Sequence, residues 1–150
     1  MTTPYDVPAR DLIEVIAKKL EKDKNIELPK GNIYSKTSID RENPPIDRNW
    51  WFTRCAAILR KVYIKNNIGI ERLTQEFGGK QDRGSKPYRA KAGSGTIARR
   101  ALQQLEKAGY LSKIKGRGRI LTPKGRSFMD NNAKEVIDNI KSYYPGLEKY

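Results

Sequence analysis

The segment from residue 94 to residue 107 constrains the fold of this chain more than any other part of the sequence. Its apolar residues recur at the spacing of one helix face, and they are Ile97, Ala98, Ala101, Leu102, Leu105 and, just beyond, Ala108. Ser94 or Thr96 is a suitable N-cap, and Gly109 is a typical residue to end a helix. The segment therefore predicts an amphipathic helix that packs one face against a core and exposes a basic, polar face.

A predicted β-hairpin follows this helix. Strands are expected at residues 111–115 and 119–122, on either side of the glycine-rich tip Gly116-Arg117-Gly118. The dipeptide Thr122-Pro123 then places an N-cap residue before a proline, a common start of a helix, and apolar residues continue at helical spacing to about Tyr143. The second half of the chain is therefore predicted to contain a helix, a hairpin and a final helix.

Three further helices are predicted in the first half of the chain. They cover residues 8–23, 47–66 and 70–77, and Asp47 is the predicted N-cap of the second one. In that second helix the apolar stripe places Trp51 in the core. The stretch 25–46 has no clear periodicity, so we expect an extended connection with at most a short helical turn.

Basic charge is concentrated in one third of the chain. The sequence contains 31 Lys and Arg against 17 Asp and Glu, a net charge of +14, and residues 78–126 alone carry 14 basic and two acidic residues, a net charge of +12. Within them, residues 78–93 combine basic side chains with glycines, and we predict a loop that is mobile in the free protein. Such local concentration indicates a binding surface for the phosphates of a nucleic acid.

Several classes of protein are excluded by the residues that are missing or scarce. The single cysteine, Cys55, excludes an internal disulfide, and the absence of histidine excludes His-based catalytic triads and most zinc sites. The carboxylates show no paired arrangement suited to acid–base catalysis. No apolar run reaches the length of a membrane span, and the first residues lack a signal-peptide core. We therefore expect a soluble intracellular protein that is not an enzyme and uses no cofactor or metal.

The order of the predicted elements, helix, short helix, helix and β-hairpin, is that of a winged-helix domain. We expect a mostly α-helical fold with a small β-hairpin, a modified winged helix with extra N-terminal and C-terminal helices that forms one domain over residues 1–150. In gene regulators of this type the two central helices are joined by a turn of about 3–4 residues, whereas here residues 78–93 lie between them. This basic insertion favours a ribonucleoprotein surface over a transcription factor.

Four motifs occur in an order that resembles one protein family. They are Asn49-Trp50-Trp51-Phe52-Thr53-Arg54, Gly78-Gly79-Lys80-Gln81, Ile97-Ala98-Arg99-Arg100-Ala101-Leu102-Gln103-Gln104-Leu105-Glu106 and Leu121-Thr122-Pro123-Lys124-Gly125. Together they are similar to small-subunit ribosomal protein nineteen of the archaeal and eukaryotic type, over almost the whole chain. The resemblance implies a cytoplasmic constituent of the small-subunit head that binds small-subunit rRNA, contacts neighbouring head proteins and supports subunit assembly and pre-rRNA maturation.

The candidate RNA-binding residues come from this resemblance and from the charge pattern. The resemblance implies RNA contacts for the residues that match its motifs: Trp50, Arg54, Arg60, Lys80, Arg83, Arg99 and Arg100. The charge pattern adds further basic side chains on the same elements and on the predicted wing: Lys61, Lys86, Arg89, Lys91, Lys113, Lys115, Arg117 and Arg119.

Some of these residues have a structural alternative. Trp50 either offers a stacking face to an unpaired base or packs against the N-terminal segment. Arg54 and Arg60 either contact RNA or pair within the protein with Asp47 or Glu71. These alternatives depend on tertiary contacts that the pattern leaves open.

A winged-helix DNA-binding transcriptional regulator is the alternative function. Such a regulator would need a dimer whose recognition helices match two half-sites on DNA. The C-terminal segment 127–150, with three basic and four acidic residues, is a poor dimer surface. We therefore expect the free protein to be a monomer.

Overall fold

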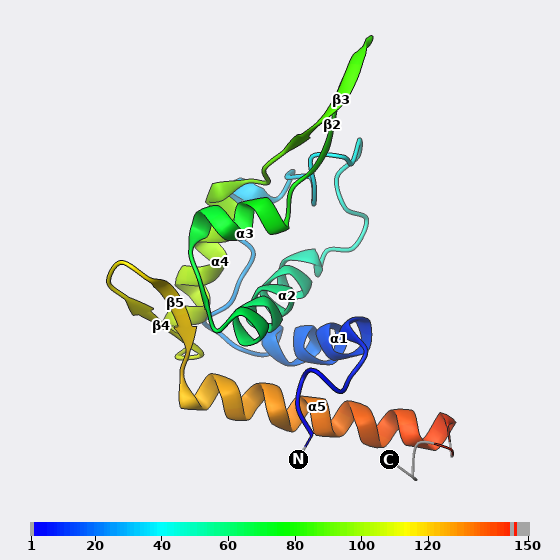
Figure 1. Ribbon diagram of the computed structural model, residues 1–150, viewed down its shortest axis with the longest axis vertical. Helices are drawn as coiled ribbons and strands as arrows, with labels where there is room; N and C mark the ends of the chain where they lie inside the picture. Colours follow the sequence, from blue (N-terminus) through cyan, green and yellow to red (C-terminus); the bar gives the residue numbers. More distant parts are fainter. Residues whose placement is uncertain (1, 145, 147–150) are drawn as a thin grey trace.

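The computed structural model describes residues 2–144 and residue 146. In chain order its elements are α1 (Ala9–Leu20), a short 3-10 helix (Lys30–Asn32), α2 (Trp50–Lys65), β1 (Asn67–Ile68), α3 (Ile70–Glu76), β2 (Gly79–Arg83), β3 (Lys86–Lys91), α4 (Gly95–Lys107), β4 (Leu111–Ile114), β5 (Gly118–Leu121) and α5 (Pro123–Tyr143). Figure 1 shows α2 at the centre, with α5 along one end of the molecule and the β2–β3 pair projecting from the opposite end. The fold is mixed, with mostly helices and two small antiparallel sheets.

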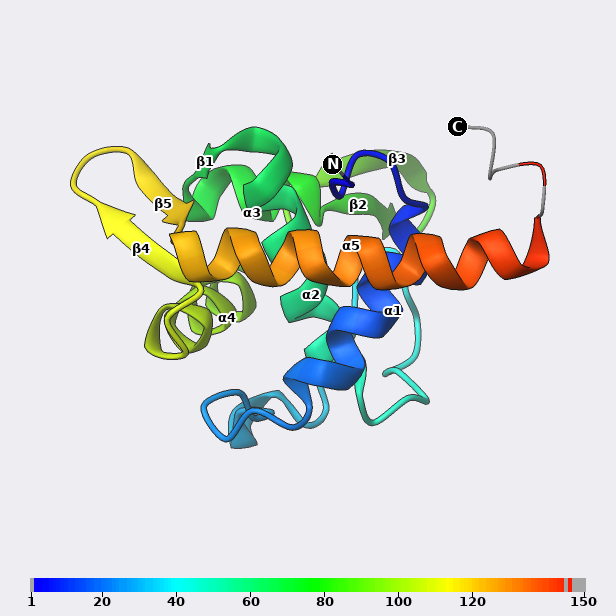
Figure 2. The same cartoon turned by 90° about the horizontal axis from the view of Figure 1, so that it is seen from below.

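Helix α2 supplies the centre of the hydrophobic core. The predicted core residue Trp51 is fully buried, and its Nε1 donates to Oε1 of Gln104 on α4 at 2.9 Å. Cys55, one turn further along α2, is also fully buried, and burial raises the pKa of its thiol to about 12. Helices α1 and α4 contact α2, while α5 crosses α1 and reaches β5 (Figure 2). The predicted core position of Trp51 is confirmed.

The predicted hairpin after α4 is part of a larger sheet. Strands β4 and β5 pair antiparallel, with Lys113 opposite Arg119, and the two-residue strand β1 adds to the other edge of β5. Gly118 is required where β5 passes β1, because its φ is +91° and a Cβ there would lie 2.5 Å from the carbonyl oxygen of Ile68. Strand β1 was not predicted, because two residues are too few to produce an alternating pattern.

Residues 78–93 form a β-hairpin, which corrects the prediction of a loop. Strands β2 and β3 pair antiparallel with a bulge between Gln81 and Arg83, and Gly84, at the turn between the strands, has a φ of +70°. All six residues of β3 are exposed, and the hairpin projects from the rest of the protein (Figure 1). A strand pair with solvent on both faces needs no apolar alternation, so the sequence carried no strand signal.

The helix starts that sequence predicted are partly confirmed. The Ser94 hydroxyl accepts a hydrogen bond from the backbone N–H of Ile97 at the start of α4, and Thr122 does the same for Gly125 at the start of α5. Asp47 is not the N-cap of α2, because the helix begins at Trp50 and Asp47 contributes only its carbonyl oxygen, at 3.4 Å from the Trp50 amide nitrogen. Among the helices of the described residues, none combines the length and apolar character that a membrane crossing needs.

Candidate nucleic-acid interface

The hairpin β2–β3 carries the densest group of exposed basic side chains. The five predicted here, Lys80, Arg83, Lys86, Arg89 and Lys91, are all exposed. In the observed register Gly79 pairs with Lys91, Gln81 with Arg89 and Arg83 with Lys86. Paired residues share a face, and residues two apart on β2 share a face as well. One face of the hairpin, the cationic face, therefore carries Arg83, Lys86, Arg89 and Lys91.

The two arginines at the start of α4 differ in their surroundings. Arg99 is exposed, whereas Arg100 is half-buried and its Nη1 donates to Oδ1 of Asn32 at 3.0 Å. Asn32 is itself buried in the short 3-10 helix. Arg100 therefore ties α4 to the irregular segment after α1, and Arg99 is the arginine of this pair that faces solvent.

The wing formed by β4 and β5 has an exposed basic tip and one buried arginine. Lys113, Lys115 and Arg117 are exposed. Arg119 is only 9 % exposed, and its Nε lies 3.6 Å from Oε2 of Glu106 on α4. The Arg119 side chain therefore lies against α4 rather than in solvent, and its contact with RNA stays a prediction.

Of the two alternatives for Trp50, the structure shows the one in which the side chain packs inside the protein. It is 7 % exposed, and its ring meets that of Trp51 edge to face with 5.6 Å between centroids. Adjacent residues on a helix point about 100° apart, so both tryptophans are buried only because the covered arc of α2 is wide. The ring of Trp50 is part of the core and offers no stacking face.

Arg54 lies half-buried beside an aromatic ring. Its Nη2 donates to the carbonyl oxygen of Thr37 at 2.6 Å, and the guanidinium carbon lies 4.2 Å from the centre of the Phe77 ring. Burial lowers the pKa of Arg54. Arg54 thus has internal partners, the Thr37 carbonyl oxygen and the Phe77 ring, and no described residue gives it the carboxylate partner considered as an alternative.

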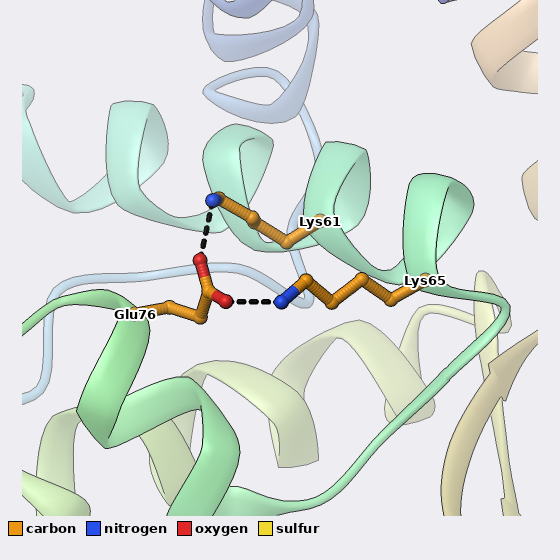
Figure 3. A network of polar contacts seen from close by, with 3 residues as sticks. All are labelled: Lys61, Lys65 and Glu76. Atoms are coloured by element: carbon orange, nitrogen blue, oxygen red, sulfur yellow. Dashed lines mark hydrogen bonds and ion pairs between the residues drawn. The ribbon is translucent and has the colours of Figure 1, made fainter.

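The two other basic residues predicted on α2, Arg60 and Lys61, are half-buried. Lys61 and Lys65 both donate to the carboxylate of Glu76 on α3, Lys61 at 2.5 Å (Figure 3). These two hydrogen bonds lower the pKa of Glu76 to about 2. Arg60 is half-buried, and its Nε has no hydrogen-bond partner among the described residues. The charge of Lys61 is therefore partly neutralised before any ligand arrives.

A basic residue that sequence analysis missed lies near Arg54. Lys36 lines a cavity of about 450 Å³ together with Arg54, Phe77 and Lys91. It belongs to the irregular stretch 25–46, in which no periodic pattern marks any position as exposed or functional. No local signal could have found it, because its position depends on how this segment folds back over α2 and β3.

The arrangement as a whole places exposed cations on both sides of α4. The hairpin β2–β3 precedes this helix, the wing follows it, and the two project in different directions (Figure 1). The basic residues therefore form an extended set of contact points that suits a large polyanion better than a small anion.

The chain matches the family model described as ribosomal protein S19e over residues 3–139. It belongs to the ribosomal protein S19e family. The protein is 44% identical over 144 residues to small ribosomal subunit protein eS19 of Thermoplasma acidophilum, which covers 96% of this chain and 95% of that relative. It is 42% identical to the protein of the same name from Aeropyrum pernix, over 100% of this chain and 99% of the relative. The Oryza sativa protein of that name is 35% identical over 89% of this chain and 92% of its own length.

Membership of the S19e family confirms the resemblance inferred from the four motifs, and the class is that of ribosomal proteins rather than enzymes. In the structure these motifs occupy the start of α2, the first strand of the hairpin, the helix α4 and the junction of β5 with α5. At that junction the Thr122 hydroxyl lies 2.7 Å from the Gly109 carbonyl oxygen, which joins the end of α4 to the start of α5. Motifs of the S19e chain thus include both surface residues and residues that hold the elements together.

Proposed function

We propose that this S19e chain is a constituent of the small ribosomal subunit head, in the cytoplasm, where it binds small-subunit rRNA and supports subunit assembly. The observation that carries the proposal is the exposed cationic face of the β2–β3 hairpin, which projects into solvent at one end of the protein. The relatives named above, all small ribosomal subunit proteins, support the same assignment. Neighbouring head proteins are its further partners, and the free protein is a monomer.

The proposed mechanism is neutralisation of RNA phosphates at many points. Each Lys or Arg that contacts a phosphate releases counterions from the RNA, so binding weakens steeply with salt. The side chains proposed for this role are the exposed ones: Lys80, Arg83, Lys86, Arg89, Lys91, Arg99, Lys113, Lys115 and Arg117. Arg54, Arg60, Lys61 and Arg100 are half-buried. Arg54, Lys61 and Arg100 hold neighbouring elements in place through their internal contacts. Only the exposed part of each of the four side chains contacts RNA.

We propose further that residues 1–150 act as one modified winged-helix domain. The order α2, β1, α3, α4, β4 and β5 supports this, with β1 on the far edge of the wing strand β5. In this fold α4 is the recognition-like helix, the β4–β5 pair is the wing, and α1 and α5 are additions. The β2–β3 hairpin replaces the short turn of a gene regulator and extends the surface available to RNA.

Competition binding tests the proposal against the DNA-binding alternative. Protein-free small-subunit rRNA from an archaeon and duplex DNA of equal phosphate concentration would compete for the purified chain in a gel-shift assay. We expect the rRNA to win, and the chain to co-sediment with small subunits through a moderate salt wash. If duplex DNA displaces the rRNA, the ribosomal assignment fails and the regulator becomes the better description.

A further inference from the structure

A hollow of about 440 Å³ lies between the β2–β3 hairpin and the segment 36–42. The hairpin contributes Lys80, Gln81, Asp82 and Tyr88, and the segment contributes Lys36, Ile39, Asp40, Arg41 and Glu42. The segment packs closely on the base of the hairpin, since a Cβ on Gly79 would lie 3.1 Å from Oδ1 of Asp40. We propose that this hollow binds one unpaired nucleobase of the RNA, stacked on the ring of Tyr88. The inference rests on the proposed function.

The charge of the hollow argues for a neutral ligand group. Its lining contains three cations and three carboxylates, Lys36, Arg41, Lys80, Asp40, Glu42 and Asp82, so its formal net charge is zero. None of the four residues of the cationic face lines the hollow, although all four belong to the same hairpin. Carboxylates repel a phosphate, whereas their oxygens accept hydrogen bonds from the amino groups of a base. The hairpin thus carries the four-residue cationic face on one side and the proposed base contacts on the other, where Lys80 is a further cation.

Tyr88 supplies the aromatic surface that a stacked base needs. It is 68 % exposed, lies where the register shifts between Lys86 and Arg89, and lines the hollow, so its side chain belongs to the hairpin face opposite Arg89. Within residues 2–144 and 146, three pairs of aromatic rings are in contact, Tyr5 with Tyr63, Trp50 with Trp51 and Tyr110 with Phe128, and Tyr88 belongs to none of them. Its ring is therefore presented to solvent beside the hollow.

A base in a duplex has no free face for such contact, because it is already stacked and paired. The site therefore selects a bulged, looped or single-stranded nucleotide. Stacking of one base on an aromatic side chain corresponds to an affinity loss of roughly 5- to 150-fold on substitution by alanine. Tyr88 adds no charge, so the stacking contribution is independent of the salt-dependent contribution of the cations.

The experiment compares charge-neutral substitutions in the full chain. The probes are a short oligoadenylate, the same phosphate backbone with abasic sugars, and an RNA duplex of equal charge. We expect Tyr88→Ala to weaken oligoadenylate binding roughly 5- to 150-fold, with unchanged binding of the abasic and duplex probes and an unchanged salt slope. Tyr88→Phe keeps the ring and should bind normally. Tyr143→Ala is the matched control, because Tyr143 is 80 % exposed at the end of α5, far from the hairpin (Figure 1).

A spectroscopic readout tests contact directly. In Tyr88→Trp the added indole is exposed, and its emission should be quenched by oligoadenylate but not by the abasic probe. The inference is overturned if Tyr88→Ala and Tyr143→Ala have the same effect on binding. It is also overturned if Tyr88→Ala weakens the binding of all three probes equally and makes the salt slope shallower, because that result indicates a misfolded hairpin. If the unaltered chain binds none of the RNA probes, the proposed function fails instead, which is a distinct result.

Discussion

Removing the cationic face of the β2–β3 hairpin should lower the salt dependence of RNA binding by the contribution of four phosphate contacts. The hairpin variant replaces the four basic residues of this face with glutamine: Arg83, Lys86, Arg89 and Lys91. Each phosphate contact contributes about 0.7 to 0.9 to the slope of log affinity against log salt, so four contacts should lower the slope by about 2.8 to 3.6. At 0.1 M salt, one decade below the 1 M reference, the same slope change corresponds to a roughly 10³-fold loss of affinity.

A control variant loses the same charge elsewhere. It replaces four exposed lysines outside residues 78–126 with glutamine: Lys18, Lys22, Lys24 and Lys134. Both variants reduce the formal net charge from +14 to +10. The control should bind small-subunit rRNA almost normally, because exposed charges farther than about 10 Å from the RNA are screened at 0.1 M salt.

The assay is a filter-binding or gel-shift titration across a range of salt concentrations, with thermal melting of each variant. Both variants should melt close to the unaltered protein, since exposed substitutions usually change stability by no more than about 0.5 kcal/mol each. Equal losses of affinity in the two variants would refute the reasoning. In that case the net charge would act as a diffuse attraction, and the hairpin would not be a specific contact surface.

Three further predictions concern stability. Arg100→Ala should cost about 1–3 kcal/mol in urea unfolding, because it leaves the side-chain oxygen Oδ1 of the buried Asn32 without its donor. Gly118→Ala should cost more than Gly116→Ala, since both have positive φ but only Gly118 would place a Cβ against the β1 backbone, and equal costs would contradict this. The pKa of Glu76 is lowered from 4.5 to about 2, so its ion pairs stabilise the fold above pH 4.5 and are lost as the pH falls toward 2. Unfolding measured between pH 2 and 5 should show less pH dependence in Glu76→Gln.

The parts of the fold that sequence predicted are those with a strong local signal. Helix α4 has a regular apolar face, the N-cap Ser94 and a stop at Gly109, so its bounds were predicted almost to the residue. The start of α5 was predicted for a similar reason, since Thr122-Pro123 specifies a cap and a first helical residue together. Each of these signals is contained within a few neighbouring residues.

The errors at the candidate site have a different origin. Sequence identified the basic residues but could not tell which of them already have partners in the folded chain. Glu106 lies 13 positions before Arg119, and Glu76 lies 15 positions after Lys61, so these pairs form only when separate elements pack together. Trp50 was ambiguous because the buried arc of α2 is wider than the apolar stripe that defines it. In each case the tertiary contact, which no local pattern encodes, decided the outcome.

The length of the hairpin also has a consequence for the kinetics of association. At about 3.3 Å per residue, the six-residue strand β3 holds the turn at Gly84 up to about 20 Å from the body of the protein. This reach is about twice the Debye length at 0.1 M salt. An RNA that approaches from this end therefore senses the positive tip while the charges of α1 and α5 are still screened. The hairpin therefore orients the protein during the encounter and contacts the RNA first. The rest of the protein then docks onto an RNA that the hairpin has already bound.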